Sequence, residues 1–201
     1  MHATGWWVMV LGPLAENGIL SAVARGALLR VAGEAIATGL RDQRWQPEPA
    51  GAPPELRVQR ASFVTLHVDG QLRGCIGTLE ARDPLIVDIA RNAWSAASRD
   101  ARFTPVEISE LDRLRIHISV LSVPEPVSAG SEAELLVLMR PGIDGLILEE
   151  GNRRGTFLPS VWEQLPEPRD FLRHLKRKAG LPEQYWSESL QISRYTTESF
   201  P

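Results

Sequence analysis

Residues suited to chemistry gather in one stretch of the chain, residues 72–78, which read LRGCIGT. The stretch holds the single cysteine, Cys75, which lies between Gly74 and Gly77 and two positions after Arg73. Glycine weakens a strand interior, and it is found there where the backbone must approach a ligand or another segment closely. A thiol, a guanidinium and uncovered backbone N–H groups are suited to binding and attacking a small anionic group. The stretch therefore predicts a site, although it does not specify a reaction.

Each of these residues also has a purely structural interpretation. Free cysteine is among the most buried residue types, so Cys75 fits a core position as well as it fits a nucleophile. Arg73 either binds an anion or extends along the sheet to solvent. Asp100 is either an orienting or basic group of the site, or a helix-end carboxylate paired with Arg99 or Arg102. The residues alone leave these alternatives open.

Composition narrows the class of protein. A chain of 201 residues is long enough for one large domain or for two closely packed sub-domains. The formal net charge of −3 and the pI of about 5.9 argue against a nucleic-acid binder with a basic surface. A single cysteine excludes an intramolecular disulfide and any zinc site built on cysteine pairs. The histidines are not spaced as metal ligands usually are. Neither a metal nor a cofactor is therefore expected. No apolar run approaches the roughly 20 residues of a membrane span. Because a single cysteine also fits a reducing compartment, a cytoplasmic location is expected.

A hairpin over residues 61–79 is the strongest local prediction, because the dipeptide Asp-Gly at 69–70 favours a type I′ turn. A regular register places Arg73 and Cys75 on one face of this hairpin. His67 then points to the other face, so it cannot activate the Cys75 thiol unless a bulge shifts the register.

Apolar periodicities predict the remaining elements. Residues 41–57 are rich in proline and glycine and are expected to form an extended surface loop. Because hairpins imply antiparallel pairing, the order of elements predicts an α+β fold with a mainly antiparallel or mixed sheet flanked by helices. Helices are expected over residues 16–40, 84–100, 106–111, 159–165 and 170–179, and one more after a capping box at 131–134. Further strands are expected over residues 114–123, 144–150, 153–158 and 189–196.

Three blocks of the sequence resemble the AMMECR domain family, whose bacterial and archaeal members are also called AmmeMemoRadiSam system protein A. The blocks are the signature at 72–78, the sequence DARFTP at 100–105, and the sequences GIDGL and GTFLPSVW within 142–162. The resemblance covers nearly the whole chain. It implies a single AMMECR-like domain at residues 16–197, made of two intimately packed sub-domains with the signature lining a groove between them. An N-terminal extension, residues 1–15, would precede this domain.

The resemblance supplies no reaction, so the functional hypothesis depends on the residues themselves. The leading hypothesis is an enzyme or enzyme subunit that acts on a small anionic or nucleotide-like molecule in this groove. The expected catalytic residues are Cys75, as the reactive group, and Asp100, as an orienting or basic residue, and the expected substrate-binding residues are Arg73, Gly74, Gly77, Thr78 and Arg102.

The rival hypothesis is a non-catalytic adaptor. The resemblance implies association with a Memo-like protein and a radical-SAM protein, and an adaptor would dock on such a partner. It would use the same groove or the segments that carry Trp6, Trp7 and Trp162, since tryptophan is a frequent interface anchor. Nucleic acid is the least favoured partner, and no membrane is expected.

Overall fold

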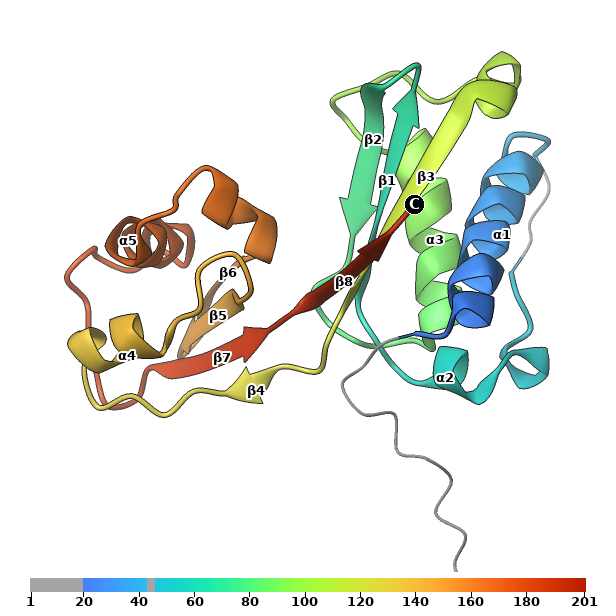
Figure 1. Ribbon diagram of the computed structural model, residues 1–201. Coiled ribbons are helices and arrows are strands. Elements are labelled where there is room, and N and C mark those ends of the chain that lie inside the picture. Colours follow the sequence, from blue (N-terminus) through green and yellow to red (C-terminus); the bar gives the residue numbers. More distant parts are fainter. Residues whose placement is uncertain (1–19, 43–45) are drawn as a thin grey trace, which may run out of the picture.

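The structure is a computed structural model, and it describes residues 20–42 and 46–201. Two four-stranded antiparallel sheets, each covered by helices, confirm the predicted α+β fold class (Figure 1). We call the part built on the sheet β2-β1-β3-β8 lobe 1 and the part built on the sheet β4-β7-β5-β6 lobe 2. Lobe 1 contains α1 (Ala22–Gly39), α2 (Pro54–Arg57), β1 (Ser62–Val68), β2 (Gln71–Gly77), α3 (Leu85–Ser98), β3 (Leu114–Leu121) and β8 (Thr197–Phe200). Lobe 2 contains β4 (Glu125–Pro126), α4 (Glu132–Leu138), β5 (Gly145–Glu150), β6 (Arg153–Phe157), α5 (Pro168–Lys178) and β7 (Gln191–Tyr195).

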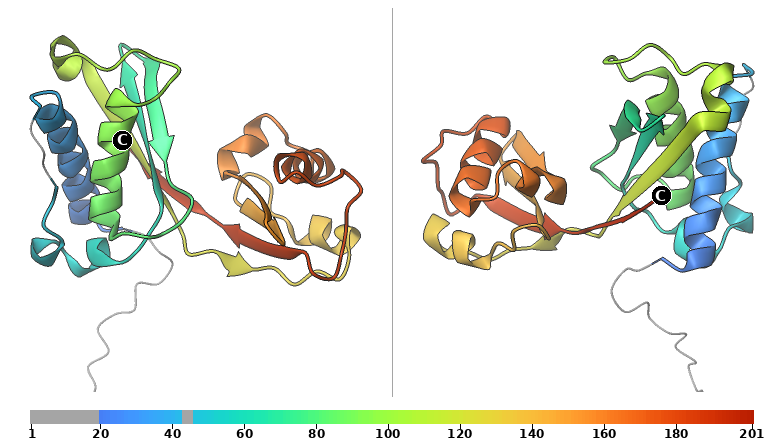
Figure 2. Two further views of the ribbon diagram at one scale, coloured as in Figure 1. Left: turned by 180° about the vertical axis from the view of Figure 1, so that it is seen from behind. Right: turned by 45° about the horizontal axis from the view of Figure 1, so that its top comes forward.

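Helices α1 and α3 of lobe 1 lie on one face of its sheet (Figure 2). The alternation of β1 and β3 selects this face, because Val64, Leu66, Ile118 and Val120 are buried beneath the helices. The side chains between them point away from the helices. They form what we call the groove face, which comprises Ala61, Phe63, Thr65, His67, Cys75, His117, Ser119 and Leu121.

The β1–β2 hairpin turns at residues 69–70, whose φ values of 51° and 79° fit the expected turn. The predicted register is wrong beyond the turn, because a β-bulge at Arg73 gives β2 one extra residue. As a result, Cys75 pairs with Thr65. His67 lies two residues further along β1, so the bulge places it on the same face as Cys75, contrary to the regular register.

The last predicted strand, residues 189–196, contains β7, whereas β8, which follows it directly, was not predicted. β7 pairs with β4 and β5 in lobe 2, and the chain then continues into β8, which pairs with β3 in lobe 1. Together with the connection from β3 to β4, this crossing forms a waist of two neighbouring segments between the lobes (Figure 1). The Ser122 N–H donates to the Thr196 carbonyl at 2.9 Å, and the Thr196 N–H donates to Ser122 Oγ at 3.0 Å.

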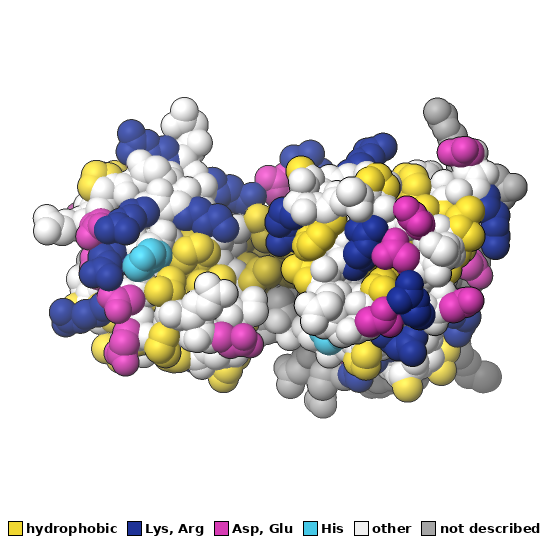
Figure 3. Space-filling view, turned by 90° about the horizontal axis from the view of Figure 1, so that it is seen from above, with side chains coloured by type: hydrophobic (Ala, Val, Ile, Leu, Met, Phe, Trp, Pro, Cys, Tyr) yellow, Lys and Arg dark blue, Asp and Glu magenta, His cyan; other side chains and the backbone are white. Residues whose placement is uncertain are grey.

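A small apolar cluster joins the lobes beside the waist. Ala61 and Leu121, at one end of the groove face, pack with Ile147 and Tyr195 of lobe 2. Burial raises the pKa of Tyr195 to about 12, and its hydroxyl donates to the Phe157 carbonyl at 3.1 Å. The groove face is thereby turned toward lobe 2, and Figure 3 shows the two lobes meeting over a narrow junction.

Two predictions concern the N-terminal region. One needs correction, and the other lies outside the described residues. Residues 41–57 are not one extended loop, because they include a 3-10 helix, Pro49–Gly51, and the short helix α2. The N-terminal extension and the predicted helix start at residues 16–19 lie outside the described residues, within which the helix begins at Ala22. Among the helices that the structure describes, none has the length and apolar character needed to cross a membrane.

Candidate functional site

Asp100 and Arg102 hold the outer edge of β2 at Cys75. The Cys75 N–H donates to Asp100 Oδ2 at 2.8 Å, and Arg102 Nη2 donates to the Cys75 carbonyl at 3.4 Å. β2 is an edge strand, so these two groups satisfy backbone polar atoms that point away from β1. The hydrogen bonds and the charge of Arg102 hold the pKa of Asp100 well below its usual range. The structure therefore brings Cys75, Asp100 and Arg102 together, with the carboxylate at the backbone rather than at the thiol.

The Cys75 thiol lies on the groove face and is half-buried. Thr65 Oγ1 donates to Cys75 Sγ at 3.2 Å, so the sulfur has a hydrogen-bond donor on the groove face. Thr65 pairs on its other side with His117, so cysteine, threonine and histidine form a row across three strands. His67 is the diagonal neighbour of Cys75, within the reach of a long side chain. Thr65 and His117 were not predicted as site residues. The signal that could have identified them is their position in β1 and β3, where they alternate with the buried residues.

Arg73, the bulge residue, is occupied by the protein itself. Its Nε and Nη2 donate to Glu110 at 2.8 and 3.0 Å, and its other donors bind the Thr104 and Pro105 carbonyls. Glu110 raises the pKa of Arg73, and Arg73 in turn lowers the pKa of Glu110. The side chains of both residues are only 16% exposed. Arg73 therefore fixes the segment after α3 against β2, and an anion would have to displace Glu110 to bind its guanidinium.

The two glycines of the signature lie where the backbone meets other parts of lobe 1. A Cβ atom on Gly74 would lie 2.2 Å from the Ala96 carbonyl oxygen of α3. A Cβ atom on Gly77 would lie 2.3 Å from the ring of Phe63. Helix and side-chain packing thus accounts for the absence of a side chain at both positions.

Thr78 belongs to a buried polar cluster beneath α3. Its Oγ1 donates to Asp88 Oδ1 at 2.8 Å, and Asp88 also accepts hydrogen bonds from Ser62 Oγ at 2.6 Å and Asn92 Nδ2 at 2.9 Å. The Asp88 carboxylate is fully buried, and it also forms an ion pair with Arg91. Thr78 thus donates to a carboxylate of the lobe 1 core, away from the row formed by Cys75.

With this geometry established, comparison with known proteins places the chain. It matches the model of the family described as AMMECR1 over residues 29–200. The chain belongs to the AMMECR1 family. It is 39% identical over 175 residues to a protein of Methanothermobacter thermautotrophicus, covering 86% of this chain and 91% of that protein. It is 44% identical over 151 residues to a protein of Thermotoga maritima, covering 74% and 82% respectively.

The AMMECR1 fold is also known from a solved structure. The crystal structure of the uncharacterized protein PH0010 from Pyrococcus horikoshii is similar, with a TM-score of 0.75 and 32% sequence identity. The similarity covers 90% of this chain and 92% of that one. These comparisons confirm the resemblance to the AMMECR family noted in the sequence.

The buried carboxylate of this AMMECR1 protein leads to a pH prediction. Burial raises the pKa of Asp88, so the folded state takes up its proton at a higher pH than the unfolded chain does. Its contribution to stability is therefore greatest below the unfolded pKa of about 3.9, and it is lost as the pH rises through the folded pKa. We expect the stability difference between wild type and Asp88→Asn to become less favourable to wild type as the pH rises above about 4.

Urea denaturation at several pH values measures this difference. Asp112→Asn, at an exposed carboxylate of the same lobe, is the matched control and should track wild type at every pH. A gap between wild type and Asp88→Asn that is constant, or that grows in favour of wild type with rising pH, would contradict the assignment.

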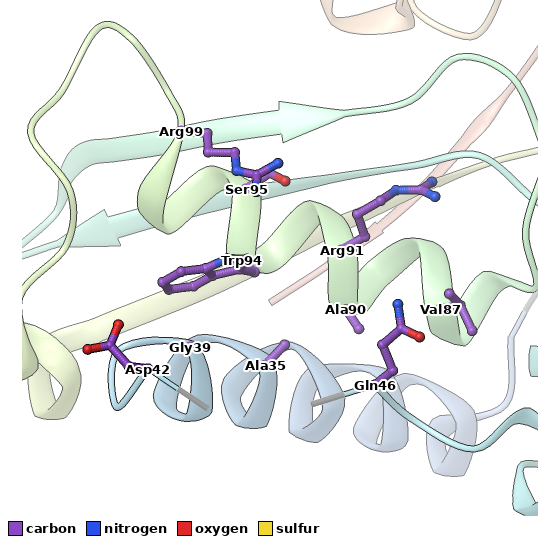
Figure 4. Close-up of a pocket in the computed structure, with 10 residues that line it drawn as sticks. All are labelled: Ala35, Gly39, Asp42, Gln46, Val87, Ala90, Arg91, Trp94, Ser95 and Arg99. Atoms are coloured by element: carbon purple, nitrogen blue, oxygen red, sulfur yellow. The ribbon is translucent and has the colours of Figure 1, made fainter. Parts of the chain in front are cut away.

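A separate cavity lies between α1 and α3, on the helical side of lobe 1 (Figure 4). Its volume is about 720 Å³, and Trp94, Arg91 and Arg99 of α3 contribute to its wall. The residues predicted from the signature do not line it. Among the described residues, no group of three or more histidine, cysteine, aspartate or glutamate side chains is arranged to hold a metal ion.

Proposed function

We propose that this AMMECR1 protein is an enzyme or enzyme subunit that acts on a small anionic or nucleotide-like molecule at the groove face, with Cys75 as the reactive group. The observation that carries the proposal is the position of the thiol. Cys75 Sγ is half-buried, faces lobe 2 and accepts a hydrogen bond from Thr65, while its backbone is held by Asp100. A nucleophilic thiol needs access and a fixed backbone, and these two features support the proposal.

The hydrogen-bond donors near the thiol favour an anionic ligand. Arg102 is 57% exposed, and its Nη1 is not used in the hydrogen bonds to Asp100 and Cys75. His67 and His117 share the groove face with the thiol, and their rings can donate hydrogen bonds. In this proposal Arg102 binds the anion, Asp100 orients Arg102 and the β2 backbone, and the other signature residues shape the site.

Protection of the thiol tests the anion site. We expect millimolar phosphate or AMP to slow alkylation of Cys75 by iodoacetamide about threefold or more, at constant ionic strength. Arg102→Gln should abolish this protection. Arg99→Gln, which removes an exposed arginine outside the groove face, should retain it. Protection that is absent in wild type, or equal in the two variants, would contradict the assignment of Arg102.

A second candidate function, docking on a Memo-like or radical-SAM protein, is favoured by one observation on lobe 2. Val137, Leu138 and Ile143 lie close together in the sequence and are 84%, 39% and 51% exposed. Exposed apolar residues that cluster are typical of interaction sites. Trp162 is not available as an anchor, because it is buried and stacks on Phe171, and Trp6 and Trp7 lie outside the described residues.

Binding to purified candidate partners separates the two functions. If the protein is an adaptor, Val137→Ser and Ile143→Ser should weaken the complex, while Cys75→Ser should leave it unchanged. A complex that tolerates both lobe 2 variants would contradict docking through these residues.

A further inference from the structure

A second arginine-rich cavity lies at the waist, distinct from the groove face. Its volume is about 700 Å³. Three arginines from separate segments line it, namely Arg60 before β1, Arg140 after α4 and Arg194 in β7. Arg60 comes from lobe 1, and the other two come from lobe 2. The cavity wall thus brings basic side chains of both lobes to one place.

The acidic groups nearby do not satisfy all of these arginines. The buried Arg194 Nε makes no hydrogen bond among the described residues, and its nearest acidic oxygen, Glu125 Oε2, is 3.7 Å away. Glu125 itself is 72% exposed. Arg140 is held by Asp144, whereas Arg60 has no ion pair within the described part of the chain. A buried donor without an acceptor is unfavourable, so Arg194 Nε favours an acceptor group that enters the cavity.

The other acidic group of the wall, Glu198, is already engaged elsewhere. It accepts hydrogen bonds from the Leu20 N–H and from Arg25, and it forms an ion pair with Arg25. When the ion-pair partners Arg25 and Asp144 are included, the cavity region carries four arginines and three carboxylates. These are Arg25, Arg60, Arg140 and Arg194, and Glu125, Asp144 and Glu198. Its formal charge is therefore +1, in a protein whose overall net charge is −3.

We propose that this cavity binds a small phosphate-bearing molecule through Arg60 and Arg194. Guanidinium groups match phosphate oxygens with paired hydrogen bonds, and a phosphate oxygen would supply the acceptor that Arg194 Nε lacks. The Thr197 hydroxyl lines the same cavity and adds a donor. A volume of about 700 Å³ exceeds the size of inorganic phosphate, and Val123 and Tyr195 provide apolar wall for the rest of the ligand. The site is an organic phosphate site, independent of the Cys75 face.

Binding at this position also has a mechanical consequence. Arg60 and Arg194 belong to different lobes, and the cavity borders both chain segments of the waist through Ser122 and Thr196. A ligand that bridges the two arginines would link the lobes. Since it binds the folded protein only, it would raise the thermal midpoint with increasing ligand concentration.

Calorimetric titration with phenyl phosphate, at constant ionic strength set with chloride, tests the proposal. We expect saturable one-to-one binding, weakened about tenfold by Arg194→Gln and by Arg60→Gln. Arg60 is only partly buried, so its variant keeps the test valid if Arg194→Gln fails to fold. Arg169→Gln, at an exposed arginine of α5, is the matched control and should bind as wild type does.

Several results would overturn the proposal. They are heat no larger than that of the chloride control, equal binding by Arg60→Gln and wild type, and benzoate binding as tightly as phenyl phosphate. Cys75→Ser should retain binding, because the groove face is a separate site. Binding that is lost in Cys75→Ser but kept in Arg60→Gln would place the anion at the groove face and would also overturn this inference.

Discussion

Replacing Gly74 with alanine is expected to destabilise the protein by about 3 kcal/mol, at the upper end of the usual cost of overpacking. The added Cβ would lie 2.2 Å from the Ala96 carbonyl oxygen, which belongs to the backbone of α3 and cannot rotate away. Either β2 or the helix must move. Urea denaturation with circular dichroism measures the loss of stability.

Gly51→Ala is the matched control for this prediction. A Cβ atom on Gly51 would meet no other part of the described chain within 4 Å, and the residue lies in a short 3-10 helix, so its substitution should change stability by less than about 0.5 kcal/mol. If Gly74→Ala were as stable as Gly51→Ala, the close contact between β2 and α3 would be wrong. The first glycine of the signature would then be free for a ligand.

Replacing Asp100 with alanine is expected to cost about 2–3 kcal/mol, because it leaves the Cys75 N–H at the strand edge without its charged acceptor. It also leaves Arg102 without its ion-pair partner. Asp100→Asn keeps an oxygen acceptor and should lose less. Asp112→Ala, at an exposed carboxylate, should lose less than about 0.5 kcal/mol. Faster hydrogen exchange of the Cys75 amide in Asp100→Ala would localise the effect to the edge of β2.

The pH dependence of the Asp100 contribution has the opposite sign to that of Asp88. The pKa of Asp100 is lowered in the folded state, so its stabilisation is present above the unfolded pKa of about 3.9 and is lost as the pH falls through the folded pKa. The stability gap between wild type and Asp100→Asn should therefore shrink below about pH 4. An undiminished gap in acid, or equal stability of Asp100→Ala and wild type, would show that the carboxylate does not hold the strand edge.

Local patterns in the sequence were sufficient to predict most helices and strands. The alternation over residues 114–123 identified the buried face of β3, and the dipeptide at 69–70 identified the hairpin turn. The division into two sheets was not predicted, because β8 follows β7 after Thr196 alone and was not recognised as a strand. Which sheet each strand joins depends on long-range pairing that no local pattern contains.

The candidate site was predicted in part. Cys75, Asp100 and Arg102 come together, but the bulge at Arg73 was missed, since no residue type marks a bulge uniquely. The partner of Arg73 was missed for a different reason. Glu110 lies 37 positions away, and only the folded chain brings the two side chains into contact.

The rate of Cys75 alkylation in the folded protein, relative to the urea-unfolded protein near neutral pH, tests the central claim most directly. Mass spectrometry with iodoacetamide measures both rates, and Thr65→Val removes the hydroxyl that donates to the sulfur. If the groove face carries a reactive thiol, the folded protein should label faster than the unfolded chain, and Thr65→Val should slow it about threefold or more. Labelling that requires unfolding, or that is indifferent to Thr65→Val, would contradict a catalytic Cys75 and leave docking as the better account.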